Sequence, residues 1–186
     1  MFEVTYLGRS VFTRYNGVES VHHFETQQEA RTRAAFVAEA VTWVGTPFVN
    51  CGDVKGPDGA VDCAMLLVRS AVDPGILPPF DPRPYPPSLL LHSDREDFLE
   101  WIRDKLGGVE VDKPKFGDVS VYLWGRIHTH GAIVLGDNLV VHAYQISGFV
   151  KFSRRDEDVL LYLPRTRKMP RPVKHFDLWS KQWLPT

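Results

Sequence analysis

Cys63 and two downstream histidines have the residue types and the order of a thiol nucleophile, its base and an orienting residue. Cys63 stands where a loop rich in glycine changes into an apolar, helix-forming run, VDCAMLLV. The first N–H groups of a helix lack intrahelical acceptors, and the helix dipole places positive charge there. Both effects favour a thiolate, the nucleophilic form of cysteine. We therefore predict that Cys63 is a nucleophile with a lowered pKa, although a cysteine in a helix is more often a small buried apolar residue.

The two histidines lie on segments with the pattern of β-strands. His130 begins the run HGAIVL, and His142 lies within LVVHAY. A histidine inside an apolar strand needs a hydrogen-bond partner. Accepting a bond from the ring N–H of His130 would supply one and would fix the tautomer that a general base requires. His128 lies two residues before His130 and remains an alternative base, and each histidine alone has an ordinary structural interpretation.

Asp62 precedes the nucleophile and is a natural N-cap for its helix. Its negative charge disfavours a neighbouring thiolate, so His130 and the helix dipole must outweigh it. The backbone N–H of Cys63 is placed to stabilise a developing oxyanion. A second cysteine, Cys51, lies in the preceding loop. A zinc site formed by both cysteines and two histidines is conceivable, but a close C-x-x-C pair is missing. We predict no metal and no cofactor.

Composition excludes several classes of function. The chain has 186 residues and a formal net charge of −1, which favours one domain and gives no global reason for binding nucleic acid. No apolar run approaches the roughly 20 residues needed to span a bilayer. The first residues lack the basic and apolar regions of a signal peptide, which predicts synthesis in the cytoplasm. A disulfide between the two cysteines is not expected in that reducing compartment.

The chain must position these residues on helices that precede strands. Capping boxes at Thr26–Glu29 and Ser93–Glu96 predict helix starts, and Gly45 with Pro47 predicts the end of the first helix. The first helix is expected to bury one face, and residues 77–88, with six prolines, should form a stiff loop. The residues of that face are Ala30, Ala34, Val37, Val41 and Val44.

From Phe116 the apolar period becomes that of strands. Helices followed by strands predict an α+β fold with N-terminal helices packed on an antiparallel sheet. We expect an N-terminal hairpin or arm over 1–25, a domain over 26–163, and a basic, proline- and tryptophan-containing tail over 164–186. The predicted strands cover residues 119–124, 130–135, 139–145, 149–152 and 159–163, with a turn at Gly136–Asn138.

Five segments together resemble the successive motifs of the NlpC-type cell-wall peptidases, over roughly residues 27–163. The resemblance implies a papain-like fold and a cysteine peptidase that cleaves peptidoglycan stem peptides, without a cofactor. It implies Cys63 as nucleophile, His130 as base and His142 as the orienting residue. The five segments are WVGTPF (Trp43–Phe48), VDC (Val61–Cys63), FGDV (Phe116–Val119), HGAI (His130–Ile133) and VHA (Val141–Ala143).

The resemblance also implies roles for three further residues. Asp62 falls where the family's acidic residue helps to bind the free amine of the stem peptide. Phe48 is expected to contact substrate, but it stands where tyrosine is common and so lacks a hydroxyl near the oxyanion site. Asp118 belongs to a Gly-Asp motif whose role is structural. Ala64 and Met65 follow Cys63 at positions where serine and glycine are frequent in the family. These departures are expected to affect substrate choice and rate, while the three predicted catalytic residues are all present.

The segment YPPSLLLH (Tyr85–His92) is similar to peptidases encoded with the tail genes of bacteriophages and gene transfer agents. This likeness implies a location at a virion tail tip, other tail-tip or hub proteins as partners, and a role in local wall penetration. Two alternatives remain open. The first alternative to a peptidase is a structural tail-tip component with little activity, and the second is an acyltransferase or deamidating enzyme that uses the same residues.

Overall fold

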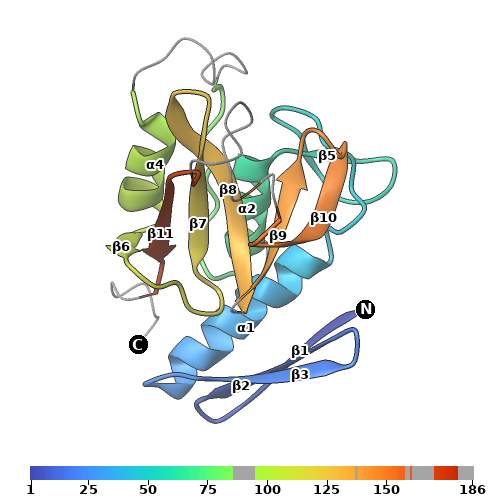
Figure 1. Ribbon diagram of the computed structural model, residues 1–186, viewed down its shortest axis with the longest axis vertical. Coiled ribbons are helices and arrows are strands. Elements are labelled where there is room, and N and C mark those ends of the chain that lie inside the picture. Colours follow the sequence, from blue (N-terminus) through green and yellow to red (C-terminus); the bar gives the residue numbers. More distant parts are fainter. Residues whose placement is uncertain (86–94, 137, 158–159, 161–169, 180–186) are drawn as a thin grey trace.

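The structure is a computed structural model that describes residues 1–85, 95–136, 138–157, 160 and 170–179. Helices α1 (Gln27–Val41), α2 (Cys63–Val72) and α4 (Asp97–Lys105) pack against a six-stranded antiparallel sheet of order β10-β9-β8-β7-β11-β6 (Figure 1). The predicted α+β fold is confirmed, with the papain-like arrangement in which the first residue of a helix faces the sheet. The strands are β6 (Val109–Val111), β7 (Val119–Trp124), β8 (Ile127–Gly136), β9 (Leu139–Tyr144), β10 (Phe149–Arg154) and β11 (Val173–Asp177).

Helix α1 begins as its capping box predicts. The Thr26 hydroxyl accepts a hydrogen bond of 3.0 Å from the N–H of Glu29. The predicted face is buried at Ala30, Ala34 and Val37, whereas Val44 lies beyond the helix and is exposed. The helix lies between the N-terminal strands and α2 and packs against both (Figure 1).

The N-terminal residues form a three-stranded antiparallel sheet, which corrects the prediction of a hairpin or arm. Its strands are β1 (Phe2–Leu7), β2 (Ser10–Tyr15) and β3 (Val18–His23). Phe2 and Tyr15 pack on Phe152 of β10 with ring centroids 5.9 and 5.0 Å apart, and Val11 is fully buried. Because these rings join one hydrophobic core with the main sheet, residues 1–25 are part of the domain.

Gly131 allows β8 to approach the helices. A Cβ at this position would lie 3.0 Å from Leu67 Cδ1 of α2 and 3.1 Å from Phe98 Cζ of α4. Strand β8 therefore lies close to side chains of both helices beside His130. The first residue of α2 is consequently held directly over this part of the sheet.

The C-terminal residues enter the main sheet, which corrects the predicted boundary at residue 163. Strand β11 lies between β7 and β6, and the indole Nε1 of Trp179 donates 3.0 Å to the carbonyl of Gly117. The sequence missed this strand because it is short and follows a basic, proline-containing segment. The predicted strand at 159–163 (apart from Leu160), Trp183, and Ser93 of the second capping box lie outside the described residues.

None of the helices in the described part of the chain is long and apolar enough to cross a membrane. Two short strands, β4 (Asp53–Val54) and β5 (Ala60–Val61), pair in the loop that leads to α2. Strand β5 ends one residue before Asp62, so the chain passes from a strand through the N-cap directly into the helix that begins with Cys63.

Candidate active site

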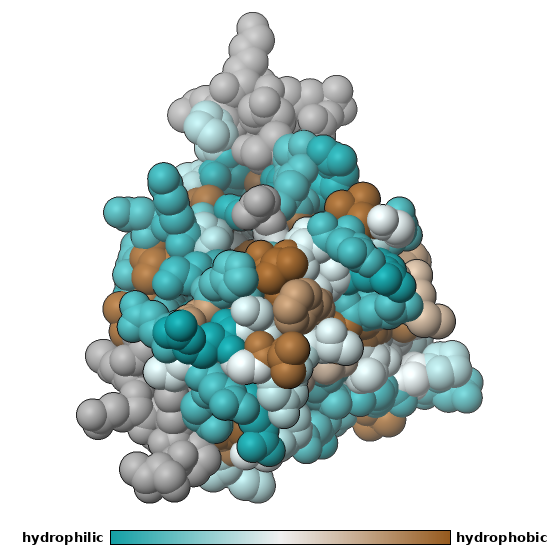
Figure 2. All heavy atoms as spheres, turned by 90° about the horizontal axis from the view of Figure 1, so that it is seen from below, coloured by the Kyte–Doolittle hydropathy of each residue, from teal (hydrophilic) through white to brown (hydrophobic). Residues whose placement is uncertain are grey.

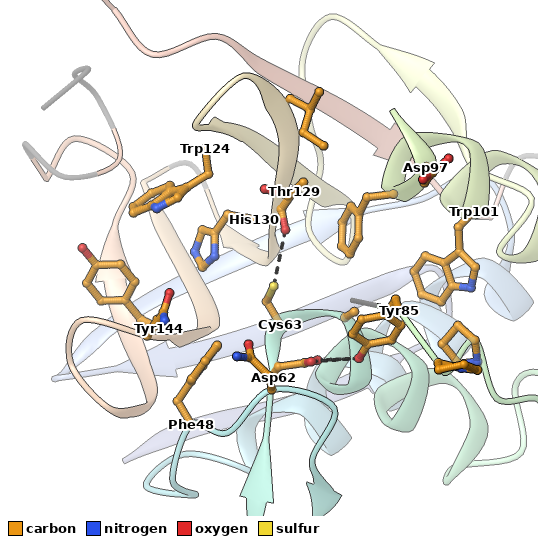
Figure 3. A pocket seen from close by; sticks show the side chains of 17 residues that line it. Phe48, Asp62, Cys63, Tyr85, Asp97, Trp101, Trp124, Thr129, His130 and Tyr144 are labelled. Atoms are coloured by element: carbon orange, nitrogen blue, oxygen red, sulfur yellow. Dashed lines mark hydrogen bonds between the residues drawn. The ribbon is translucent and has the colours of Figure 1, made fainter. Parts of the chain in front are cut away.

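Cys63 is the first residue of α2, and Asp62 is its N-cap as predicted. The Asp62 carboxylate accepts a 2.8 Å bond from the N–H of Met65. The Cys63 thiol donates to the carbonyl of Thr129 over 3.5 Å, and the N–H of Gly131 also points toward the sulfur. The sulfur therefore lies against the backbone on both sides of His130, and Figure 3 shows the two side chains facing the same cleft.

His130 and His142 are linked, as the sequence predicts, in a buried chain of hydrogen bonds. His130 Nε2 lies 2.7 Å from His142 Nδ1, and His142 Nε2 lies 2.9 Å from the hydroxyl of Ser153. The three side chains are at most 7% exposed. His130 Nδ1 is the ring nitrogen that takes no part in this chain, and His130 lines the cleft. The thiol of Cys63 itself donates to the Thr129 carbonyl, so the roles of nucleophile, base and orienting residue stay predictions.

Burial sets the charge states of Cys63 and His130, and for Cys63 the pKa shifts in the direction opposite to the one that the sequence predicts. Burial and, after it, the charge of Asp62 raise the pKa of Cys63 to about 12, although neighbouring N–H groups oppose the rise. Burial also lowers the pKa of His130 to about 3, with a contribution from the positive charge of Arg171. The site at rest therefore holds a neutral thiol beside a neutral imidazole, and the predicted lowering of the Cys63 pKa is wrong.

The structure separates the two candidate bases. His128 Nδ1 lies 2.8 Å from Glu96 Oε1, and the His128 N–H donates 2.8 Å to Glu96 Oε2. His128 therefore ties β8 to the N-terminus of α4. His130, in contrast, belongs to the cleft lining and to the buried histidine pair.

The carboxylate of Asp62 accepts hydrogen bonds from within the protein, whereas a carboxylate that binds a substrate amine must be accessible from the cleft. Besides Met65, its oxygens accept bonds from the N–H of Cys51 (2.7 Å) and from the hydroxyl of Tyr85 (2.8 and 2.9 Å). The residue is 4% exposed. The implied contact of Asp62 with a substrate amine is therefore not open in this structure.

The cleft over Cys63 has a volume of about 460 Å³ and extends to both sides of the sulfur (Figure 3). Phe48 lines it, as the resemblance implies, and presents a ring without a hydroxyl. Trp124 and Tyr144 form the wall beside His130, whereas Phe98 and Trp101 lie on the side of α4. The walls are mainly aromatic and proline side chains, which favours extended, partly apolar chains as ligands.

Sequence reasoning missed Ser153 and Tyr85. Ser153 lies on β10, two residues from the partner of His142 in the antiparallel register and on the same face. That alternation is a signal in the sequence, but the register is needed to use it. Tyr85 lies in the proline-rich loop, whose path over the site no local pattern defines.

The structure also bears on metals and on the Gly-Asp motif. No group of three or more His, Cys, Asp or Glu side chains within the described ranges is arranged to hold a metal ion, and both cysteines are free thiols. Asp118 binds the guanidinium of Arg33 (2.6 Å) and the N–H of Lys115 (2.7 Å), away from the cleft. These contacts agree with its predicted structural role.

Fold and site together define a papain-like protein in which a cysteine and a histidine line one cleft, and that histidine is bonded to a second, fully buried histidine. No family model matches the chain, and no curated protein matches it. Among solved structures it is similar to NlpC1 from Trichomonas vaginalis, with 16% identity and a TM-score of 0.46 over 90% of this chain and 54% of that one. It is also similar to NlpC2 from the same organism, with 15% identity and a TM-score of 0.47 over 90% of this chain and 57% of that one. The chain thus spans little more than half the length of these two proteins.

Proposed function

We propose that the protein is a cysteine peptidase or amidase that hydrolyses peptide bonds in peptidoglycan stem peptides. The observation that carries the proposal is the position of the Cys63 sulfur between the Thr129 carbonyl and the Gly131 N–H, beside a buried histidine pair. The aromatic cleft provides room for a peptide on both sides of the sulfur. The likeness of five sequence segments to NlpC-type peptidases supports the substrate class.

The neutral pair implies that proton transfer accompanies attack. His130 Nδ1 takes the thiol proton as sulfur bonds to the substrate carbonyl carbon, and His142 Nδ1 accepts the Nε2–H bond of the resulting imidazolium. That proton then passes to the leaving amine as the C–N bond breaks, which gives a thioester and neutral His130. Water, deprotonated by His130, attacks the thioester, and the proton returns to sulfur as the carboxylic acid leaves.

The first turn of α2 supplies the oxyanion contact. Cys63 and Ala64 are the first two helical residues, and N–H groups at these positions have no intrahelical acceptor. They point toward the sulfur and therefore toward the oxygen of a bound tetrahedral intermediate. Phe48 adds no hydrogen bond there, so this backbone must provide most of the stabilisation.

Mass spectrometry of purified peptidoglycan after incubation with the protein tests the proposal. We expect new stem-peptide fragments from the wild type and from Cys51→Ala, which removes the other thiol, but none from Cys63→Ala. Their masses identify the bond that is cleaved. Absence of fragments from every variant, on walls of several chemotypes, would overturn the proposal and favour a structural protein, an alternative to which the raised pKa of Cys63 gives some weight.

We further propose that this activity serves a phage-like tail tip, with the protein made in the host cytoplasm and bound to other tail proteins. The support is the likeness of Tyr85–His92, of which only Tyr85 lies among the described residues. The outer face of the N-terminal sheet also carries exposed apolar side chains on an otherwise polar surface (Figure 2), including Leu7, Phe12 and Val21. Co-sedimentation with tail particles tests the role, and failure to bind them contradicts it.

A further inference from the structure

The hydroxyl of Tyr85 is hydrogen-bonded to the carboxylate of Asp62, the residue next to Cys63. It lies 2.9 Å from Oδ1 and 2.8 Å from Oδ2. The N–H of Met65 donates to Oδ1, and the N–H of Cys51 donates to Oδ2. Each carboxylate oxygen thus has a backbone donor, and the hydroxyl lies between the two oxygens (Figure 3). A ligand ammonium would have to displace Tyr85 to reach this carboxylate.

The segment 78–85, here called the proline strap, holds Tyr85 in this position. Arg83 donates 2.9 Å to the carbonyl of Cys51 and 2.9 Å to Asp53, and it also pairs with Asp81 of the strap itself. The ring of Phe80 lies 5.9 Å from that of Trp101 on α4. The strap is therefore anchored both to the loop before α2 and to α4, on the two sides of the cleft.

The chemistry of the remaining cleft favours an uncharged amino terminus. An ammonium loses hydration when it enters an apolar cleft and needs a carboxylate in return. Both oxygens of Asp62 already accept from a backbone N–H, and the Tyr85 hydroxyl, which donates its one proton to either oxygen, covers them from the cleft side. Asp97, the other lining carboxylate, pairs with Arg95 at 3.1 Å. An amide nitrogen carries no charge and needs no such partner.

We propose that Tyr85 is a specificity-determining residue that closes Asp62 to a substrate amine, so that the cleft selects peptides with a blocked amino terminus. For a wall hydrolase, these are stem peptides still joined to the glycan strand by an amide. The inference rests on the proposed function and specifies its substrate. It departs from the amine-binding role that resemblance implies for Asp62.

Binding to Cys63→Ala, which cannot turn substrate over, tests the inference. A stem tripeptide and its N-acetylated form are titrated by calorimetry into this variant and into Cys63→Ala/Tyr85→Phe. We expect the acetylated peptide to bind at least as tightly as the free one. Tyr85→Phe should strengthen binding of the free peptide about tenfold, because Asp62 loses its hydroxyl partner, and change that of the acetylated peptide less than twofold. Tyr6→Phe, in the N-terminal sheet, should change neither affinity.

Three results would overturn the inference: tighter binding of the free peptide to Cys63→Ala, no binding of the acetylated peptide, or an unchanged affinity ratio in the Tyr85→Phe variant. Hydrolysis is measured separately with the wild type on intact sacculi and on released stem peptides. Lack of hydrolysis with the expected affinities would contradict the proposed chemistry and leave the role of Tyr85 standing. Hydrolysis together with an unchanged affinity ratio in the Tyr85→Phe variant would support the proposed chemistry and contradict the role of Tyr85.

Discussion

At the scale of single residues, burial determines the charge states of Cys63 and His130. A pKa of about 12 for the thiol and about 3 for the imidazole keeps both groups neutral across the physiological range. The proposed attack would then be possible over a broad range of pH, because neither group would have to titrate first. The helix dipole and nearby N–H groups act on the thiol, but in this cleft they do not exceed the cost of burying a charge.

Asp62→Asn should make Cys63 more reactive. After burial, the charge of Asp62 is the next largest cause of the raised Cys63 pKa, so its removal lowers that pKa. We expect alkylation of Cys63 by iodoacetamide at pH 8 to become about tenfold faster, in keeping with the loss of one nearby charge. Peptide mass spectrometry measures the rate. Asp58→Asn, in the exposed part of the loop, is the control, and an unchanged rate in Asp62→Asn would contradict the assigned electrostatics.

Ser153→Ala should impair the base without affecting binding. Loss of the hydroxyl removes the partner of His142 Nε2. A buried hydrogen bond of this kind is worth about 1 kcal/mol, which corresponds to roughly a fivefold lower kcat if His142 orients His130. KM should not change, and Ser153→Thr should restore kcat. Steady-state kinetics on a stem peptide check this, and an equal fall with both substitutions would indicate a packing role instead.

The sequence predicts the members of the site better than their environment. Cys63, His130, His142 and Asp62 are recognisable from residue type, order and their neighbours. Burial of the thiol depends on how α2 docks on β8, which no local pattern specifies, and so the direction of its pKa shift was predicted wrongly. Ser153 becomes evident only once the register of β9 and β10 is known.

At the scale of elements, the approach of α2 to β8 positions the nucleophile, and Gly131 permits it. Helix α1 and most strands of the main sheet follow from the first capping box and hydrophobic periodicity. Helix α4 begins later than the predicted cap at Ser93, with Glu96 as N-cap and no side-chain cap hydrogen bond. Strand β11 does not, because its pairing with β7 and β6 joins residues more than 50 positions apart in the chain. Non-local pairing of this kind is specified by tertiary packing rather than by the segment itself.

Gly131→Ala should move α2, which carries Cys63, away from β8, which carries His130. The new Cβ would meet Leu67 and Phe98 at 3.0 to 3.3 Å, so α2 or β8 has to shift by a few tenths of an ångström. We expect the free energy of unfolding to fall by about 1 to 3 kcal/mol and kcat to fall by at least about tenfold. Gly136→Ala, in the same strand, meets an atom only at 3.9 Å and is the control. Urea unfolding and kinetics measure both effects, and equal behaviour of the two variants would refute the argument.

At the scale of the whole molecule, the two chain ends belong to one core. The N-terminal sheet packs on α1 and β10, and the C-terminal segment adds β11 to the main sheet. Arg33 of α1 links these parts with buried ion pairs to Asp118 (2.6 Å) and Asp177 (3.0 Å). It also donates 2.8 Å to the carbonyl of Phe116. Its guanidinium also lies 5.1 Å from the centre of the Phe24 ring, so Arg33 contacts all three parts that the sequence separates into arm, domain and tail.

Arg33→Ala should destabilise the protein as a whole, because it leaves the buried Asp118 without its cation. Removal of one partner from a buried ion pair costs about 3 to 5 kcal/mol, whereas Arg31→Ala, on the exposed side of the same helix, should cost little. Burial already raises the pKa of Asp118 to about 6 although Arg33 opposes it. Without Arg33 that pKa rises further.

The folded Arg33→Ala variant then binds this proton more tightly than the unfolded chain does. Its free energy of unfolding therefore falls as pH rises from about 4 toward the raised pKa of Asp118. We expect a larger loss of stability at pH 8 than at pH 5, and partial rescue by Asp118→Asn, which removes the unpaired charge. Urea denaturation at both pH values measures this. A loss equal to that of Arg31→Ala, or one independent of pH, would show that Arg33 does not hold the two ends of the chain in one core.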